Sequence, residues 1–238
     1  MTKTYNDIMD IRLIGYTQPV DMIGIDDVQD LIAYCAKVSN PQFQTDFSRS
    51  DKLLNYLIEH QHWSPFEMAS ATMEVTTTRD IARQFLRHRS FSFQEFSQRY
   101  ANPQDMETSF VLREARLQDE KNRQNSIEIE DEVLQSEWDA KQLRAIRAAR
   151  RAYNWAIKKG IAKEQARVVL PEGNTVSRLY ANGTIRSWIH YIEVRTDPGT
   201  QKEHRIIAEQ CAQELSKVVP IISEFVYNKT PVGEWLGL

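Results

Sequence analysis

The segment RHRSFSFQEFSQRY, residues 87–100, concentrates the side chains best suited to chemistry. Its polar positions follow the pattern R-H-R-x7-S-x-R, which runs from Arg87 to Arg99. A guanidinium is permanently charged and can bind two oxygens of a phosphate at once. Glu95 and Ser97 add a carboxylate and a hydroxyl. This mixture of donors and acceptors predicts a site for an anionic ligand of nucleotide type, whereas the R-H-R triplet alone would also suit a solvated basic helix end.

Three further arginines lie downstream in apolar, helical contexts. They are Arg167 in ARVVLP, Arg186 in IRSWIHYI and Arg195 in YIEVRTD. Any one of them could simply lay its aliphatic stem over the core. Together with the R-H-R cluster, they indicate arginines that converge on an anionic pocket.

Two histidines, His60 and His62, precede the sequence SPFE at residues 64–67. They could bind a metal, but no Cys, His or carboxylate cluster with ligand spacing accompanies them, so we expect no metal site. Ser64 as N-cap, with Pro and then Glu67 after it, predicts a capping box. The exposed amides of such a turn could bind an anion, or the turn could be purely structural; both interpretations remain open.

Several common catalytic patterns are absent from the sequence. There is no GxGxxG, P-loop or GxSxG motif. Ser97 has no obvious His and Asp partners, which argues against a serine hydrolase. Cys35 and Cys211 follow apolar residues at helical spacing and are predicted to be buried, inert thiols.

The composition is that of a soluble globular protein. Of 238 residues, 41% are hydrophobic and 26% charged, and the net charge is −3. This acidic balance argues against a general nucleic-acid binder. Two cysteines are too few for a disulfide framework. The N-terminal MTKTYNDIMD is not a signal peptide and no apolar run reaches membrane length, so we expect a cytoplasmic protein that binds neither membrane nor nucleic acid.

The hydrophobic periodicity predicts a single helix-rich α+β domain over residues 1–238. We expect its strands to form an antiparallel-type sheet flanked by helices. The expected helices are 26–39, one from 50 to about 58, 79–89, a long one ending at Gly160, 162–170, 185–194 and 200–219. The expected strands are 68–78, 175–181 and a short one at 110–112, with a turn at Asn182-Gly183.

The helix predicted over 79–89 orients the first part of the motif. Its apolar arc would contain Ile81, Ala82, Phe85 and Leu86, while Gln84, Arg87 and His88 would share the opposite, exposed face. Arg89 falls inside the apolar arc and is predicted to point inward. Because a buried guanidinium is costly without a partner, either the helix ends earlier or an anion meets Arg89 there.

These segments together resemble the flavin-dependent thymidylate synthases, which make dTMP from dUMP. Besides R-H-R-x7-S-x-R, the similar segments are HQHWSPFE (60–67), ARQFLRHR (82–89), ARVVLP (166–171) and RSWIHYIEVR (186–195). The resemblance covers about residues 25–220 and is weakest over 103–150. The sequence departs from the family at Ser64, where Thr is common, at Gln94, where Asn is frequent, and at Thr184, which replaces the Asn of an N-x-R segment.

The resemblance implies a homotetramer with active sites shared between subunits, FAD as cofactor, and NADPH and methylenetetrahydrofolate as co-substrates. The residues that it assigns to FAD are His62, Ser64, Glu67, Arg87, His88, Arg89, Glu95, Thr184, Arg186 and His190. The residues that it assigns to dUMP are Gln84, Arg87, Glu95, Phe96, Ser97, Gln98, Arg99, Arg167 and Arg195.

Arg195 is the expected catalytic residue. In the family, the matching arginine lies beside the pyrimidine, where its charge would stabilise negative charge that develops on the ring. C5 would then act as a nucleophile without help from an enzyme thiol.

Two other functions remain possible from the sequence. One is a nucleotide-binding or nucleic-acid-binding module without turnover, because Phe91, Phe93, Phe96 and Tyr100 alternate with polar and basic residues in a way that suits base stacking. The other is a flavoprotein without methylation activity.

Overall fold

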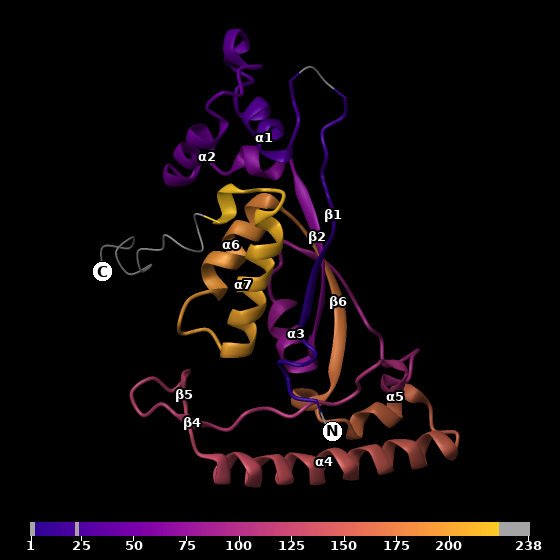
Figure 1. The fold of residues 1–238 in the computed structure, drawn as a ribbon. Coiled ribbons are helices and arrows are strands. Elements are labelled where there is room, and N and C mark those ends of the chain that lie inside the picture. Colours follow the sequence, from indigo (N-terminus) through magenta and orange to yellow (C-terminus); the bar gives the residue numbers. More distant parts are fainter. Residues whose placement is uncertain (1–2, 22–23, 224–238) are drawn as a thin grey trace.

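A four-stranded antiparallel sheet runs through the centre of the molecule (Figure 1). The computed structural model describes residues 3–21 and 24–223. The strands lie in the order β1 (Asp10–Tyr16), β2 (Ser70–Thr78), β6 (Val176–Thr184) and β3 (Ser92–Glu95). The long central pair, β2 and β6, is hydrogen-bonded from Ser70 opposite Thr184 to Thr78 opposite Val176.

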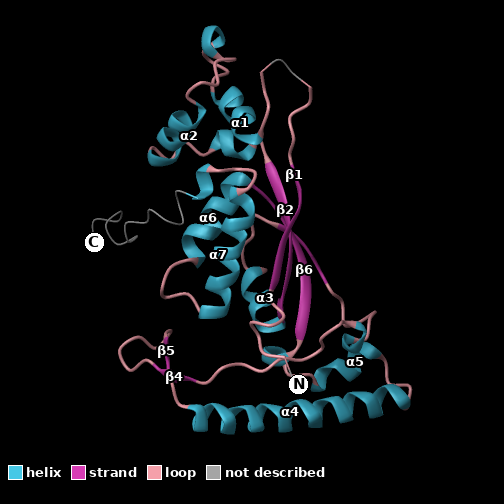
Figure 2. Cartoon of the chain, viewed as in Figure 1, coloured by secondary structure: helices cyan, strands magenta, loops and turns pink. Residues whose placement is uncertain are grey.

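Helices cover one face of this sheet (Figure 2). They are α3 (Arg79–Phe85), α6 (Ile185–Arg195) and α7 (Lys202–Ser216). Side chains alternate along β6, so that Leu179 and Ala181 are buried while Tyr180 and Asn182 are exposed. The core between sheet and helices is apolar, with Phe85 and Trp188 completely buried in it.

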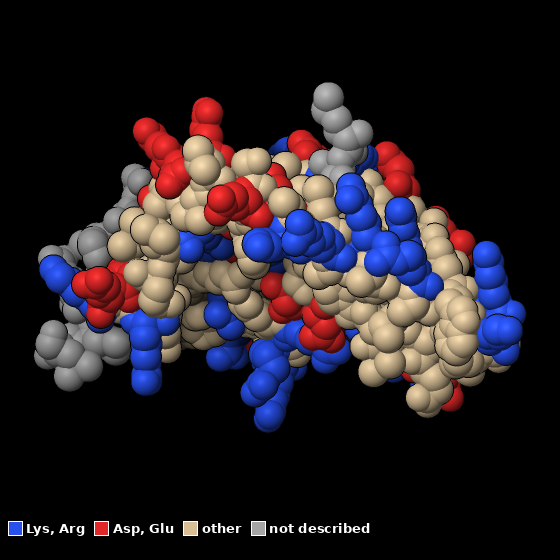
Figure 3. All heavy atoms as spheres, turned by 90° about the horizontal axis from the view of Figure 1, so that it is seen from below, with Lys and Arg blue, Asp and Glu red and all other residues tan. Residues whose placement is uncertain are grey.

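The remaining helices lie beyond the two ends of the sheet (Figure 1). At one end are α1 (Val28–Ala36) and α2 (Ser50–Glu59). At the other, α4 (Glu132–Lys158) crosses beneath the strands between the small hairpin of β4 (Arg116–Gln118) and β5 (Ser126–Glu128) and the short α5 (Lys163–Ala166). Seen from below, this end carries many basic side chains, with acidic ones beside them (Figure 3).

Local signals explain where these helices begin and end. Asp27 and Asp131 cap α1 and α4 by accepting hydrogen bonds from backbone N–H groups of the first turn. Gly160, with φ of +78°, follows the end of α4, where a left-handed conformation favours glycine. Within the described residues, every helix is too short or too polar to span a bilayer.

The predicted fold class is confirmed: the chain is α+β, with an antiparallel sheet flanked by helices. The long helix ending near Gly160 and the helix beginning at Ser50 are also confirmed. β1, β3 and the β4–β5 hairpin were not predicted from the sequence. Residues 110–112 form only isolated bridges.

Three local predictions are wrong. Asn182-Gly183 makes no turn but continues β6, where Gly183 leaves room for the Phe91 ring; a Cβ on Gly183 would lie 2.6 Å from that ring. Ser64 is not an N-cap, because it is already the first residue of a 3₁₀ turn, Ser64–Glu67, which is preceded by Trp63 and has no side-chain cap. Cys35 is only half-buried, whereas Cys211 is completely buried as predicted.

Candidate active site

The predicted catalytic residue, Arg195, lies at the C-terminal end of α6 and contacts the turn that follows α3. Its Nε donates a hydrogen bond to His88 Nε2 at 2.8 Å. Burial, together with the charge of Arg195, lowers the pKa of His88 to about 4, so His88 is neutral near pH 7. Stacking of Phe85 on Tyr191, with ring centroids 4.4 Å apart, holds the two helices together at this point.

Gln84, assigned to dUMP, lies one turn earlier on α3 and contacts α7. Its Nε2 donates to Gln201 Oε1 at 2.7 Å, and its Oε1 lies 3.3 Å from His204 Nδ1. His204 is completely buried. Burial, then Arg195 and His88, lower the pKa of His204 to about 3.

Arg87 and Arg89 are both exposed on the turn after α3. Neither forms an ion pair with another residue in the described part of the chain. The expectation that Arg89 points inward is therefore wrong, and the alternative that the helix ends before Arg89 is confirmed. The helix ends at Phe85, so the helical phase that would have buried Arg89 does not extend to it.

Residues assigned to FAD gather at the opposite, N-terminal end of α6. Arg186 Nη1 lies 2.5 Å from Glu67 Oε1, and this pair joins α6 to the 3₁₀ turn. The rings of His190 and Trp63 are 5.6 Å apart. Thr184 caps α6 by accepting a hydrogen bond from Ser187 N at 3.2 Å.

Two more residues of this group, His62 and Ser64, are exposed just before and within the 3₁₀ turn. Gln61, at a φ of 58°, turns the chain after α2. His62 N then bonds back to Leu57 O at 2.7 Å, which fixes the backbone at this end. The side chains of His62 and Ser64 are therefore accessible to a ligand, while hydrogen bonds hold the backbone that carries them in place.

Glu95, at the end of β3, is held within the chain. Its Oε1 lies 3.2 Å from Arg79 Nη1 and accepts a hydrogen bond from Ser177 Oγ at 2.8 Å. Phe96 N donates to Arg178 O at 2.8 Å and so continues the pairing beside β6.

The last part of the motif reaches α5. Arg99 N lies 3.4 Å from Ser97 Oγ, and Arg99 Nε lies 3.5 Å from Glu164 Oε2. Gln98 is 3% exposed, and its Nε2 has no hydrogen-bond partner among the residues described. Arg167, half-buried after α5, makes no ion pair within the described residues.

The assigned residues thus fall into three groups: the turn after α3 with Arg195, the N-terminal end of α6, and the segment from Glu95 to Arg99 with Arg167. Between residues that the structure describes, no hydrogen bond or ion pair joins one group to another. Arg113 and Glu203 line two cavities of about 340 and 260 Å³, and none of the assigned residues lines either cavity.

The structure also bears on two other chemistries. Burial raises the pKa of both Cys35 and Cys211, so neither thiol is activated. Among the described residues, no group of three or more His, Cys, Asp or Glu side chains could hold a metal ion.

Among the residues that contact the assigned ones, Arg79, Ser177, Gln201 and His204 were not predicted. His204 had a signal, because it shares the helical stripe of Ile207, Ala208 and Cys211, and a histidine on a buried stripe needs a partner. The contacts of Arg79, Ser177 and Gln201 depend on tertiary structure, so no local sequence pattern indicates them.

Comparisons with known proteins identify the family. Residues 13–221 match the family model described as "Thymidylate synthase complementing protein". The chain is 48% identical over 216 residues to a "Probable flavin-dependent thymidylate synthase" of Paramecium bursaria Chlorella virus 1, covering 91% of this chain and 98% of that protein. It is 47% identical over 217 residues to the "Flavin-dependent thymidylate synthase" of a Synechocystis strain, covering 90% and 98% respectively.

A solved structure agrees with the sequence relatives. The crystal structure of the UMP/dUMP methylase PolB from Streptomyces cacaoi, bound with 5-Br dUMP, superposes with a TM-score of 0.77 at 26% identity. The superposition covers 91% of this chain and 93% of PolB. The chain therefore belongs to the flavin-dependent thymidylate synthase family.

Proposed function

We propose that this protein catalyses the reductive methylation of dUMP to dTMP, with methylenetetrahydrofolate as carbon donor and NADPH-reduced FAD as electron donor. The hydrogen bond between Arg195 and His88 is the observation that carries this proposal. Electrons must pass from the flavin to a carbon held by the pyrimidine, so the two ligands must meet. Arg195, assigned to dUMP, and His88, assigned to FAD, contact each other directly.

The side chains assigned to FAD suit such a group chemically. Arg87 and Arg89 are exposed guanidiniums without carboxylate partners among the described residues, and they match a pyrophosphate. The Glu67–Arg186 pair and His190 offer further polar contacts along α6. The residues that would hold FAD are His62, Ser64, Glu67, Arg87, His88, Arg89, Glu95, Thr184, Arg186 and His190. The chemistry that FAD supplies when bound is the delivery of two electrons to the methylene on dUMP.

Arg195 would act as a fixed cation beside the pyrimidine. His88 Nε2 accepts a hydrogen bond from the Nε–H of Arg195 and thereby orients the guanidinium, leaving the Nη groups for substrate. Because His88 is neutral near pH 7, it adds no second charge there. The guanidinium would stabilise negative charge on the ring as C5 attacks, so the step needs no thiol.

The remaining dUMP residues would provide cations for its phosphate and polar contacts for its sugar and base. Arg87, Arg99 and Arg167 suit the phosphate because they are not buried in ion pairs. The polar and aromatic contacts would come from Gln84, Glu95, Phe96, Ser97 and Gln98.

A homotetramer with shared active sites would bring the separated groups together. Apolar side chains are exposed around the junction of α4 and α5, near Arg167. They are Tyr100 (74% exposed), Trp155 (59%), Val168 (82%) and Val169 (42%). Such a surface suits contact with a second copy, which could offer its Arg167 to a neighbouring site. That the whole chain acts as one cytoplasmic domain, away from nucleic acid and membranes, remains a prediction.

One experiment tests the activity. The purified protein is inspected for a flavin spectrum and then mixed anaerobically with NADPH, dUMP and methylenetetrahydrofolate. We expect oxidation of reduced flavin coupled to dTMP formation. Bound flavin without dTMP would indicate a flavoprotein that does not methylate dUMP. Binding of oligonucleotides at physiological salt, without flavin, would favour a nucleic-acid-binding module.

A further inference from the structure

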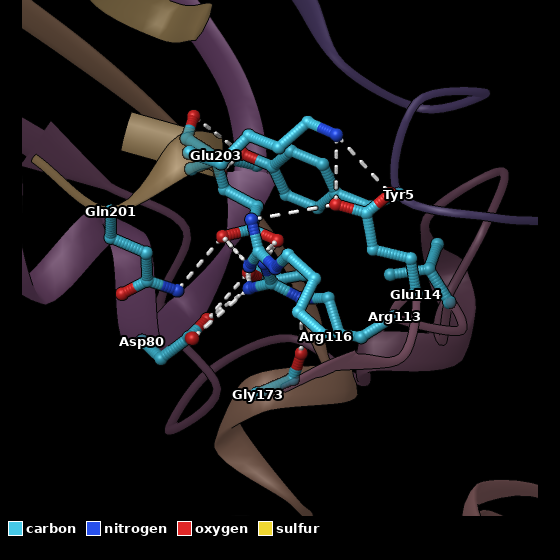
Figure 4. A network of polar contacts seen from close by, with 12 residues as sticks. Tyr5, Asp80, Arg113, Glu114, Arg116, Gly173, Gln201 and Glu203 are labelled. Atoms are coloured by element: carbon cyan, nitrogen blue, oxygen red, sulfur yellow. Dashed lines mark hydrogen bonds and ion pairs between the residues drawn. The ribbon is translucent and has the colours of Figure 1, made fainter. Parts of the chain in front are cut away.

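A buried carboxylate, Glu203, lies at the start of α7, where Figure 4 shows it surrounded by guanidiniums. Its side chain is 5% exposed. Arg116 Nη2 donates to both carboxylate oxygens at 2.7 and 2.8 Å, and Arg113 Nη1 lies 3.0 Å from Oε1. Burial alone would raise the pKa of Glu203, but the two arginines outweigh it and lower the pKa to about 2. Glu203 is therefore ionised and can only accept hydrogen bonds.

This carboxylate fixes the orientation of two amides. Gln201 Nε2 donates to Glu203 Oε2 at 2.9 Å, a contact that is also drawn in Figure 4. The Oε1 of Gln201 is then free to accept from Gln84 Nε2 at 2.7 Å. The Oε1 of Gln84 consequently faces His204 Nδ1. Because the carboxylate has no proton to donate, reversing either amide would set two acceptors or two donors against each other.

The same logic assigns the tautomer of His204. The oxygen of Gln84 is an acceptor, so the proton of the neutral ring lies on Nδ1. The ring stays neutral near pH 7, since burial, Arg195 and His88 lower its pKa to about 3. Nε2 then carries a lone pair, and in the described part of the chain it has no hydrogen-bond partner.

One proton of the Gln84 amide remains unused by these contacts. Its oxygen faces His204 and one N–H bonds to Gln201, which leaves the second N–H as a donor for a ligand. We propose that Gln201 and Glu203 are positioning residues that hold Gln84 with this proton toward an oxygen of dUMP. The proposal rests on the assignment of Gln84 to dUMP in the proposed function.

The substitution Gln201→Met tests the proposal, because it removes both hydrogen bonds at an exposed position without removing any assigned residue. We expect the KM for dUMP to rise about 3- to 10-fold, the loss expected from one poorly oriented hydrogen bond. The kcat and the FAD content per subunit should stay at wild-type values. The matched control is Gln213→Met, an exposed glutamine on the same helix, which should leave all three unchanged.

A second measurement reports the orientation of the Gln84 amide through the tautomer of His204. The chain has five histidines, so ¹⁵N-histidine labelling of the FAD-loaded enzyme gives a simple spectrum. The signal that is lost in His204→Phe is assigned to His204. We expect the Nδ1–H tautomer in the wild type and in Gln213→Met. In Gln201→Met, where the Gln84 amide can reverse, we expect a mixture of the two tautomers.

The outcomes separate the two proposals. If Gln84→Met raises the KM for dUMP while Gln201→Met does not, Gln84 contacts the substrate and the positioning role is refuted. If Gln84→Met also leaves the KM unchanged, the assignment of Gln84 to dUMP is wrong and the positioning role falls with it. An Nε2–H tautomer of His204 in the wild type would overturn the proposed donor and acceptor directions of the hydrogen bonds that lead from Glu203 through Gln201 to Gln84.

Discussion

Two groups of arginines in this molecule differ in how their charge is balanced. Arg113 and Arg116 are nearly buried, and Asp80 and Glu203 accept their hydrogen bonds (Figure 4). Arg87, Arg89 and Arg167 have no carboxylate partner among the described residues. The first group is neutralised by carboxylates of the chain itself. The second keeps its charge available, as a site for anionic ligands requires.

The first prediction concerns stability and comes from removing one arginine of the first group. Arg113→Met leaves Asp80 unpaired and Glu203 with one arginine, and should lower the free energy of unfolding by about 3 kcal/mol. Urea unfolding of the FAD-loaded protein, followed by circular dichroism, measures this. Arg147→Met, at an exposed position on α4, is the control and should change it by less than about 0.5 kcal/mol. Equal stability of the two variants would refute the structural role of Arg113.

The next effect concerns catalysis. Arg195→Ala should lower kcat for dTMP formation about 10²- to 10³-fold, because the cation beside the developing charge is lost. FAD content, measured by absorbance after gel filtration, should remain near that of the wild type. A parallel loss of FAD would show that Arg195 holds the cofactor rather than stabilising the pyrimidine.

A smaller effect is expected from the second group. Arg167→Met should weaken dUMP binding about 10- to 100-fold, the range for a lost charged hydrogen bond, without lowering the free energy of unfolding. Isothermal titration of dUMP and urea unfolding on the same samples give both numbers. A destabilisation as large as that of Arg113→Met would remove the distinction between the two groups.

The smallest effect is a dependence of stability on pH. The pKa of His204 is about 3 in the folded chain and near 6.5 when unfolded. Between these values the unfolded chain binds more protons, so stability falls as pH drops below 6.5, by about 1.5 kcal/mol between pH 6.5 and 5, and His204 adds no pH dependence above this range. His204→Phe should make the loss of stability between pH 6.5 and 5 shallower by that amount. The control Gln213→Met, which changes no titratable group, should follow the wild-type slope.

Much of the fold follows from hydrophobic periodicity, and the exceptions have physical causes. Asn182-Gly183 has the composition of a turn, but its glycine serves the close approach of Phe91. β1 is defined by pairing with β2, a partner about sixty residues away, and the two strands of the β4–β5 hairpin have only three residues each. Segments so short, or so dependent on a distant partner, carry little periodicity of their own.

The motif and the resemblance supplied the candidate residues of the site but not their supporting contacts. The exposure of Arg87 was predicted from the helical phase, whereas that of Arg89 followed only from the alternative that the helix ends earlier, and the helix does end four residues earlier, at Phe85. Arg113 and Glu203 are ninety positions apart in sequence, so nothing local indicates that they pair. The segment 103–150 was expected to resemble the family least, yet Arg113 and Arg116 of this segment contact Glu203 at the start of α7.

The length of α4 has a consequence for how this part of the chain can vary. Its 27 residues form a rod of about 40 Å between the β4–β5 hairpin and α5. Deleting one residue would rotate everything beyond it by about 100°, and deleting seven would restore the angle to within about 20° but shorten the rod by about 10 Å. Insertions and deletions that a surface loop would tolerate should therefore be excluded from α4, since they would carry Arg167 out of phase with the rest of the molecule.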